Sequence, residues 1–224
     1  KLGRQPMEYH HNGQRIVVTY NGEIYNFREI RQQLEKAGYT FRSSTDTEII
    51  PAAYLEWGPG CVEKFNGMWA FALYDSNKKL LLLSRDRFGE KPLYYRLVGG
   101  KLIFASEIKA ILVHPIQRRS NREVLSDYLF KGSANHRLDS FFQDIQMIPP
   151  AHNAVFDLRA GSFTLNKYYI PQFGKRHVPR DEFKEVLRKS VARRLVYHVP
   201  ISVSLISWVG RSSVAALTRV FTDI

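Results

Sequence analysis

Two short groups of polar residues could together bind a small charged molecule. The first is Asn21-Gly22-Glu23, and the second is Asp46, which lies in the segment STDTE at positions 44–48. A free amino acid presents an ammonium and a carboxylate. Glu23 and Asp46 could bind the ammonium, and backbone amides of a turn near Gly22 could bind the carboxylate. These residues therefore predict a pocket for a free amino acid.

The same residues also have a purely structural interpretation. Asn-Gly after the β-branched and aromatic residues 15–20 is a strong signal for a hairpin turn. Asp46 precedes a helical pattern and could be its N-cap. A cap and a ligand use different lone pairs of one carboxylate, so both roles can coexist. Taken alone, the residues favour the structural interpretation.

Other reactive side chains are interpreted as structural. Charged residues in one segment predict an ion-pair cluster at a strand end: Arg85, Asp86, Arg87 and Lys91. Glu107 and Lys109 are interpreted in the same way. The single cysteine, Cys61, is interpreted as a small core residue. The seven histidines show no metal-ligand spacing, so no metal site is predicted.

Composition limits the class of protein. The 224 residues suffice for one large domain, or for one domain and part of a second, and 44% hydrophobic residues can form a core. One cysteine excludes a disulfide framework and favours a reducing, cytoplasmic setting. The longest apolar run, residues 80–83, is too short to span a membrane.

The net charge of +12 raises the question of nucleic-acid binding. Basic residues gather between positions 175 and 194, where apolar residues recur at helical spacing. A solvated basic helix face explains this pattern better, because no aromatic residues are interleaved to stack on bases. We therefore expect no nucleic-acid partner. A non-catalytic basic protein that recruits an acidic partner is kept as an alternative.

Local patterns predict an α+β fold rather than alternating βαβ units. Helices are expected at 27–37, 47–57 and 121–130. Strands are expected at 15–20, 68–74, 79–84, 93–97 and 101–105, with a strand pair within 154–169. After residue 170 the composition becomes polar and basic, which indicates a connector. The residues that follow predict a helix at 181–195 and a buried strand at 199–206. We predict a domain over 1–170, a linker over 171–180 and the start of a second domain over 181–224.

Five segments in one order carry a resemblance to a known family. They are NGEIYN (21–26), STDTE (44–48), FNGMWAFA (65–72), RDRFGEKPLYY (85–95) and ASEIKA (105–110). Over nearly the whole length the chain resembles the glutamine-hydrolysing asparagine synthetases. The resemblance implies a four-layer αββα amidotransferase domain of the N-terminal-nucleophile type. It also implies that residues 181–224 begin an α/β ATP-pyrophosphatase domain.

The resemblance further implies a reaction at two sites. In the first, an N-terminal cysteine thiolate attacks the side-chain amide of glutamine, with its own amine as base. In the second, ATP adenylates aspartate, and ammonia then displaces AMP to give asparagine; Mg²⁺ supports this chemistry. The implied partners are glutamine, aspartate and ATP, and a homodimer is possible. The implied protein is an ATP-dependent carbon–nitrogen ligase.

Carried over by position, Asn21, Gly22 and Glu23 resemble the segment that holds glutamine. Asn21 would also donate a hydrogen bond to the oxyanion of the reaction. Asp46 resembles the second anchor for the glutamine ammonium. With the resemblance, the ligand interpretation of these four residues becomes the favoured one.

Two departures from the family pattern bear on activity. The sequence opens at Lys1, inside the implied amidotransferase domain, and contains no counterpart of the N-terminal cysteine. The expectation is that the chain as given does not hydrolyse glutamine. An amidotransferase-like pseudoenzyme of the β-lactam synthetase type is the alternative.

The second departure lies in the implied ATP loop. The family pattern Ser-Gly-Gly-x-Asp-Ser-Ser corresponds here to residues 207–213, which read SWVGRSS. Trp208 and Val209 add bulk where backbone amides would approach phosphate, and Arg211 replaces the acidic metal ligand. A local frameshift could produce this loop. The positions still assigned to ATP are Ile206, Ser207, Ser212 and Ser213.

Overall fold

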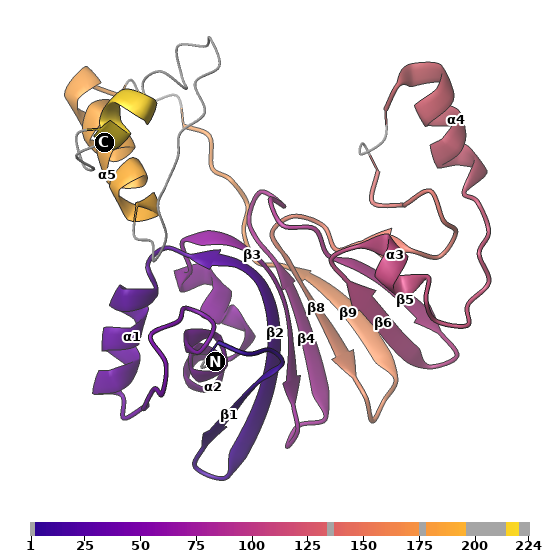
Figure 1. The fold of residues 1–224 in the computed structure, drawn as a ribbon, viewed down its shortest axis with the longest axis horizontal. Helices are drawn as coiled ribbons and strands as arrows, with labels where there is room; N and C mark the ends of the chain where they lie inside the picture. The colour runs from indigo at the N-terminus through magenta and orange to yellow at the C-terminus, as the bar shows by residue number, and fades with distance from the viewer. Residues whose placement is uncertain (1–2, 134–136, 175–177, 196–213, 220–224) are drawn as a thin grey trace. The chain divides into compact units, whose positions relative to one another are not determined.

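The computed structural model describes residues 3–133, 137–174, 178–195 and 214–219. The chain divides into two compact units, Lys1–Ile170 and Pro171–Ile224. The larger unit contains two β-sheets with helices, and the smaller unit contains α5 (Arg180–Arg194) (Figure 1). No helix in the described residues is long and apolar enough to cross a membrane.

The strands of the larger unit form two antiparallel sheets. The six-stranded sheet has the order β1-β2-β3-β4-β8-β9. Its strands are β1 (Met7–His11), β2 (Gln14–Ile24), β3 (Gly67–Asp75), β4 (Leu80–Arg85), β8 (His152–Asp157) and β9 (Ser162–Lys167). The second sheet has the order β6-β5-β7, formed by β5 (Tyr94–Val98), β6 (Lys101–Ala105) and β7 (Gln146–Met147). The α+β class predicted from the sequence is confirmed.

One face of the six-stranded sheet is covered by helices. These are α1 (Phe27–Lys36), α2 (Ile49–Trp57) and the 3-10 helix η1 (Gly58–Lys64) (Figure 1). Ile30 and Leu34 lie one turn apart on α1 and are buried in the same core as Ile16 and Val18 of β2. This core is continuous from β1 to α2, so it fixes β2 relative to the helices.

The other face of the sheet packs on the second sheet. Because side chains alternate along a strand, β3 contributes Trp69 and Phe71 to the helix-side core and Ala70 and Ala72 to the core between the sheets. Leu93 joins the second core from the segment before β5. The strand β3 is therefore buried on both faces, and its pairing with β2 fixes the position of β2 in the sheet.

Two helices follow the second sheet. The short helix α3 (Ile108–Ile111) contacts β5 and β6. The helix α4 (Arg122–Lys131) begins at Asn121, whose side chain accepts hydrogen bonds from two backbone amides of the first turn, and ends at Gly132 in the left-handed conformation. The sequence prediction for this helix, 121–130, is confirmed to within one residue.

The prediction of a hairpin turn at Asn21-Gly22 is wrong. The strand β2 runs through both residues, and Gly22 pairs with Trp69 of β3. A Cβ on Gly22 would lie 2.2 Å from the backbone oxygen of Met68, so this position needs glycine for close strand contact and not for a turn. The hairpin turn instead occurs at Asn12-Gly13, which joins β1, a strand that the sequence analysis missed, to β2.

The predicted strand at 199–206 lies outside the described residues. The predicted helix at 181–195 corresponds to α5. The first βα unit of a second domain, the frameshift hypothesis and the ATP positions Ile206, Ser207, Ser212 and Ser213 also lie mostly or wholly outside the described residues, and they stay predictions.

Candidate functional site

The segment Asn21-Gly22-Glu23 lies at the C-terminal end of β2, where this strand pairs with the start of β3. Residues 16, 18 and 20 of this strand point into the helix-side core, whereas Thr19 and Asn21 line a cavity on the opposite face. The continuous pairing of β2 with β3 also removes the turn whose amides were expected to bind a carboxylate. That expectation is therefore wrong for the backbone near Gly22.

Asp46 reaches the same strand from the loop between α1 and α2. Its Oδ2 accepts one hydrogen bond from the Tyr20 hydroxyl at 2.7 Å and another from the Ile24 backbone amide at 3.0 Å. The structural alternative of an N-cap is wrong, because α2 begins after Glu48 and no side chain caps it. Asp46 is instead tied to β2 on both sides of Glu23.

The loop that carries Asp46 is shaped by a neighbouring acid. Glu48 is buried and accepts hydrogen bonds from the backbone amides of Arg42 and Ser43 and from the Ser43 hydroxyl. These bonds satisfy a carboxylate that burial would otherwise destabilise. Within the segment STDTE, one acid therefore holds the loop and the other faces β2.

Glu23 and Asp46 form an acidic pair, because the negative charge of Asp46 acts on the carboxyl of Glu23. Burial raises the pKa of the Glu23 carboxyl, the negative charge of Asp46 raises it further, and Lys91 opposes the shift. Among the described residues the Glu23 carboxylate takes part in no ion pair or side-chain hydrogen bond, and Lys91 is the cation that acts on it. Two close carboxylates of this kind attract a cation, and an ammonium with several donors fits them.

We expect Glu23→Gln to make the protein more stable at pH 7. The pKa of Glu23 is higher in the folded chain than in the unfolded chain, so ionisation of Glu23 lowers stability as pH rises above its unfolded value. Denaturant unfolding at several pH values should show a gain at pH 7 that vanishes below about pH 4.

The matched control for this prediction is Glu8→Gln. Hydrogen bonding to Arg15 lowers the pKa of Glu8, so the charged form of Glu8 is the favoured one and its removal should give no such gain. Equal or lower stability of Glu23→Gln at pH 7 would contradict the electrostatic account of the acidic pair.

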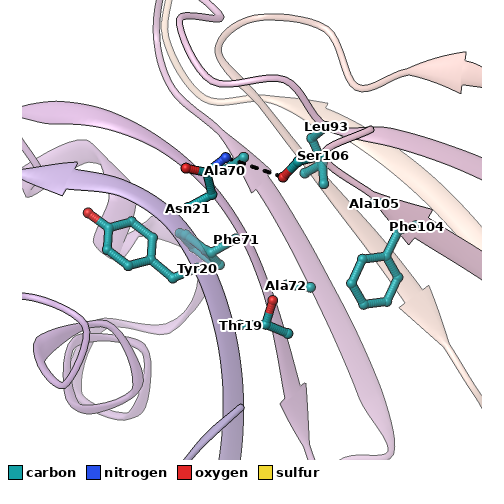
Figure 2. Close-up of a pocket in the computed structure, with 10 residues that line it drawn as sticks. All are labelled: Thr19, Tyr20, Asn21, Ala70, Phe71, Ala72, Leu93, Phe104, Ala105 and Ser106. Carbon is teal, nitrogen blue, oxygen red and sulfur yellow. Dashed lines mark hydrogen bonds between the residues drawn. The ribbon is translucent and has the colours of Figure 1, made fainter. Parts of the chain in front are cut away.

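Asn21 lies at the rim of a cavity of about 300 Å³ between the two sheets. Figure 2 shows this cavity with residues from β2 and β3 on one side and from the β6 end on the other. The Nδ2 of Asn21 donates a hydrogen bond of 3.4 Å to Oγ of Ser106, which directly follows β6. The sequence analysis placed Ser106 in a family segment, ASEIKA, but gave it no role.

The segment RDRFGEK is held by hydrogen bonds to the backbone, and the predicted ion-pair cluster is wrong. The buried carboxylate of Asp86 accepts bonds from the amides of Trp69, Phe88, Glu90 and Lys91. The guanidinium of Arg85 donates to the backbone oxygens of Gly89, Lys91 and Ile148. Among the described residues neither Asp86 nor Arg85 forms an ion pair. Backbone groups satisfy both side chains instead.

This network connects the segment to the candidate site. Asp86 binds the amide of Trp69, and Trp69 is the β3 partner of Gly22. Asp86 and Arg85 also bind the backbone amide and oxygen of Lys91, whose charge acts on Glu23. The sequence analysis left Lys91 as structural, and only the folded geometry indicates its electrostatic contribution.

Cys61 behaves as the core residue that the sequence analysis described. It lies in η1, is fully buried, and burial raises the pKa of its thiol to about 12. It is therefore a poor nucleophile. Among the described residues no group of three or more histidine, cysteine, aspartate or glutamate side chains could hold a metal ion.

Comparison with a family model gives a match to the glutamine amidotransferase domain over residues 1–169. The chain is 34% identical over 220 residues to a protein of Bacillus subtilis (strain 168) named asparagine synthetase [glutamine-hydrolyzing] 3, covering 96% of this chain and 36% of that protein. It is 33% identical over 244 residues to a putative asparagine synthetase [glutamine-hydrolyzing] 2 of Methanocaldococcus jannaschii, covering 99% of this chain and 46% of that protein.

The fold also matches a solved structure. Glutamine phosphoribosylpyrophosphate amidotransferase from B. subtilis superposes with a TM-score of 0.53 at 17% identity, over 75% of this chain and 32% of that one. At this identity the likeness concerns the fold alone, and it confirms the amidotransferase type of fold. The two synthetases above are much longer than the present chain, which spans less than half of each.

Proposed function

Because this chain belongs to the glutamine amidotransferase domain family, we propose that residues 1–170 bind free glutamine for release of its amide nitrogen. The site comprises Asn21, Gly22, Glu23 and Asp46. Similarity to proteins named glutamine-hydrolysing asparagine synthetases supports this choice of substrate.

The observation that carries the proposal is the acidic pair of Glu23 and Asp46 beside Asn21. Burial and the charge of Asp46 oppose the charging of Glu23, as the direction of its pKa shift indicates. The ammonium of an amino acid would relieve both effects, because it offers three donors and a positive charge. The ligand is then anchored at one end, and its side chain can extend towards Asn21.

Asn21 is proposed to act on the side-chain amide of the ligand. Attack on an amide carbon places negative charge on its oxygen, and a fixed N–H donor stabilises that charge more than it stabilises the ground state. In the family the attacking group is an N-terminal cysteine thiolate. None of the four proposed site residues is a nucleophile, so their role is to bind and orient glutamine.

The proposal extends to the natural enzyme as a whole. We propose an ATP-dependent ligase of the asparagine synthetase type, which uses ammonia from glutamine, aspartate and ATP to form asparagine, AMP and pyrophosphate. ATP and Mg²⁺ would act in the domain that begins near residue 181, and a homodimer in the cytoplasm is the proposed setting. The residues assigned to ATP lie outside those that the structure describes.

Titration calorimetry of the natural protein with glutamine tests the site. We expect Asp46→Asn to weaken glutamine binding by at least about tenfold, because the charge facing the ammonium is lost. The asparagine oxygen can still accept the bonds from Tyr20 and Ile24, so stability should change little. The control Glu8→Gln removes a carboxylate from an exposed pair with Arg15 and should bind glutamine normally.

The result that would overturn the proposal is equal affinity of the Asp46→Asn variant and the natural protein for glutamine. Binding of glutamine without hydrolysis would identify a pseudoenzyme of the β-lactam synthetase type. Hydrolysis that depends on Asp46 would identify an active glutaminase.

A further inference from the structure

A polar contact joins the two sheets beside the candidate site. Asn21 belongs to β2 of the six-stranded sheet, whereas Ser106 follows β6 of the other sheet, 85 positions later in the chain. Figure 2 shows the two side chains pointing toward one another across the rim of the cavity, joined by a dashed line. We propose that Ser106 is a positioning residue that orients the carboxamide of Asn21 for the glutamine reaction.

The backbone holds Ser106 in place from both sides. Before it, β6 pairs with β5 as far as Ala105, which faces Tyr94. After it, α3 begins at Ile108 and is anchored by Ile111, which is fully buried. Ser106 is half-buried between these two elements. Its hydroxyl oxygen is thus presented to Asn21 by rigid structure and not by a free loop.

Orientation matters because the two ends of a carboxamide have opposite character. The nitrogen carries two N–H donors, and the oxygen is an acceptor. A bond from one N–H to Ser106 leaves the second N–H free to donate to the ligand. A shift of the carboxamide away from Ser106 would move this second donor out of place and weaken its stabilisation of a developing negative charge.

The length of the contact fits an orienting role better than a stabilising one. At 3.4 Å between Nδ2 and Oγ it is a long hydrogen bond, and Asn21 is exposed. Such a bond contributes little to folding in water, yet it restrains the carboxamide of Asn21 at the cavity. Catalytic hydrogen bonds are often long before the ligand binds and shorten in the complex. Ser106→Ala should therefore fold normally, which makes it a clean test.

The experiment measures glutamine hydrolysis by the natural protein and five variants. This inference depends on the proposed glutamine site. We expect Ser106→Ala to lower kcat about three- to tenfold with little change in KM or melting temperature, as loss of one neutral hydrogen bond implies. Ser106→Thr keeps the hydroxyl and should restore most of kcat. The control Ser162→Ala, at an exposed position of β9, should match the natural protein.

A double variant separates positioning from other roles. If Ser106 acts through Asn21, adding Ser106→Ala to Asn21→Ala should cause no further loss of kcat. Equal kcat values for Ser106→Ala and the natural protein would overturn the inference, and so would an additional loss in the double variant. A fall in melting temperature that accounts for the lost activity would also count against it, because it indicates a structural link. No hydrolysis by the natural protein would instead overturn the proposed glutaminase activity, and the inference with it.

Discussion

Asp86→Ala is expected to lower the free energy of unfolding by about 3–5 kcal/mol, the range seen when one partner of a buried charged network is removed. Asp86 is fully buried, and its two oxygens accept bonds from four backbone amides, those of Trp69, Phe88, Glu90 and Lys91. Without the carboxylate these donors lose their acceptor in a place that water does not reach easily. Equilibrium unfolding in urea, followed by tryptophan fluorescence, to which the buried Trp69 contributes, measures the effect.

The matched control for this change is Asp157→Ala. Asp157 also accepts bonds from two backbone amides, those of Arg159 and Ala160, but it does so in an exposed hairpin where water can replace it. A much smaller loss of stability is expected there. If the two variants lose similar amounts, burial of the Asp86 network is not the source of its stability.

Replacement of Asp86 should also change the candidate site. The segment from Phe88 to Lys91 would lose its main anchor, and Lys91 would no longer hold a fixed position relative to Glu23. Amide hydrogen exchange at Phe88, Glu90 and Lys91 should therefore become faster in the Asp86→Ala variant, ahead of exchange in the core strands. Unchanged exchange at these three amides would contradict the proposed anchor.

Asn21→Ala is expected to reduce kcat for glutamine hydrolysis by about a hundred- to a thousandfold, as for the removal of one oxyanion donor in other enzymes. This expectation rests on the proposed function. Glutamine binding should change much less, because Glu23 and Asp46 anchor the other end of the ligand. Steady-state kinetics of the natural protein, with glutamine as the varied substrate, separate the two effects.

Two controls show whether the lower kcat of Asn21→Ala comes from the amidotransferase site. Asn166→Ala alters an exposed asparagine in β9 and should leave the kinetics unchanged. If the proposed ligase activity is present, free ammonia in place of glutamine should restore it in Asn21→Ala, since ammonia bypasses the amidotransferase site. A rise in KM with unchanged kcat would show that Asn21 binds the ground state, and the oxyanion role would then be wrong.

The sequence by itself determined most of the local structure. Periodic apolar residues such as Ile30 and Leu34 predicted α1, and the short run 68–74 followed by the turn residues 75–77 predicted β3, because these patterns depend only on neighbours along the chain. The order of the five motif segments also indicated the family, and it placed Asn21, Gly22, Glu23 and Asp46 in the candidate site. Local patterns and motif order can both be recognised without the tertiary structure.

The tertiary structure decided which partner each polar group has. Asn21-Gly22 is a typical turn sequence, yet it lies in a strand because β3 approaches so closely that only glycine fits at position 22. Asp46 could have capped α2, but its carboxylate instead accepts hydrogen bonds from Tyr20 and Ile24 of β2. Ser106 contacts Asn21, and Lys91 acts on Glu23, only because segments far apart in the chain meet in the fold. Hydrogen bonds and charges act through space, so their pairing depends on the fold and not on spacing along the sequence.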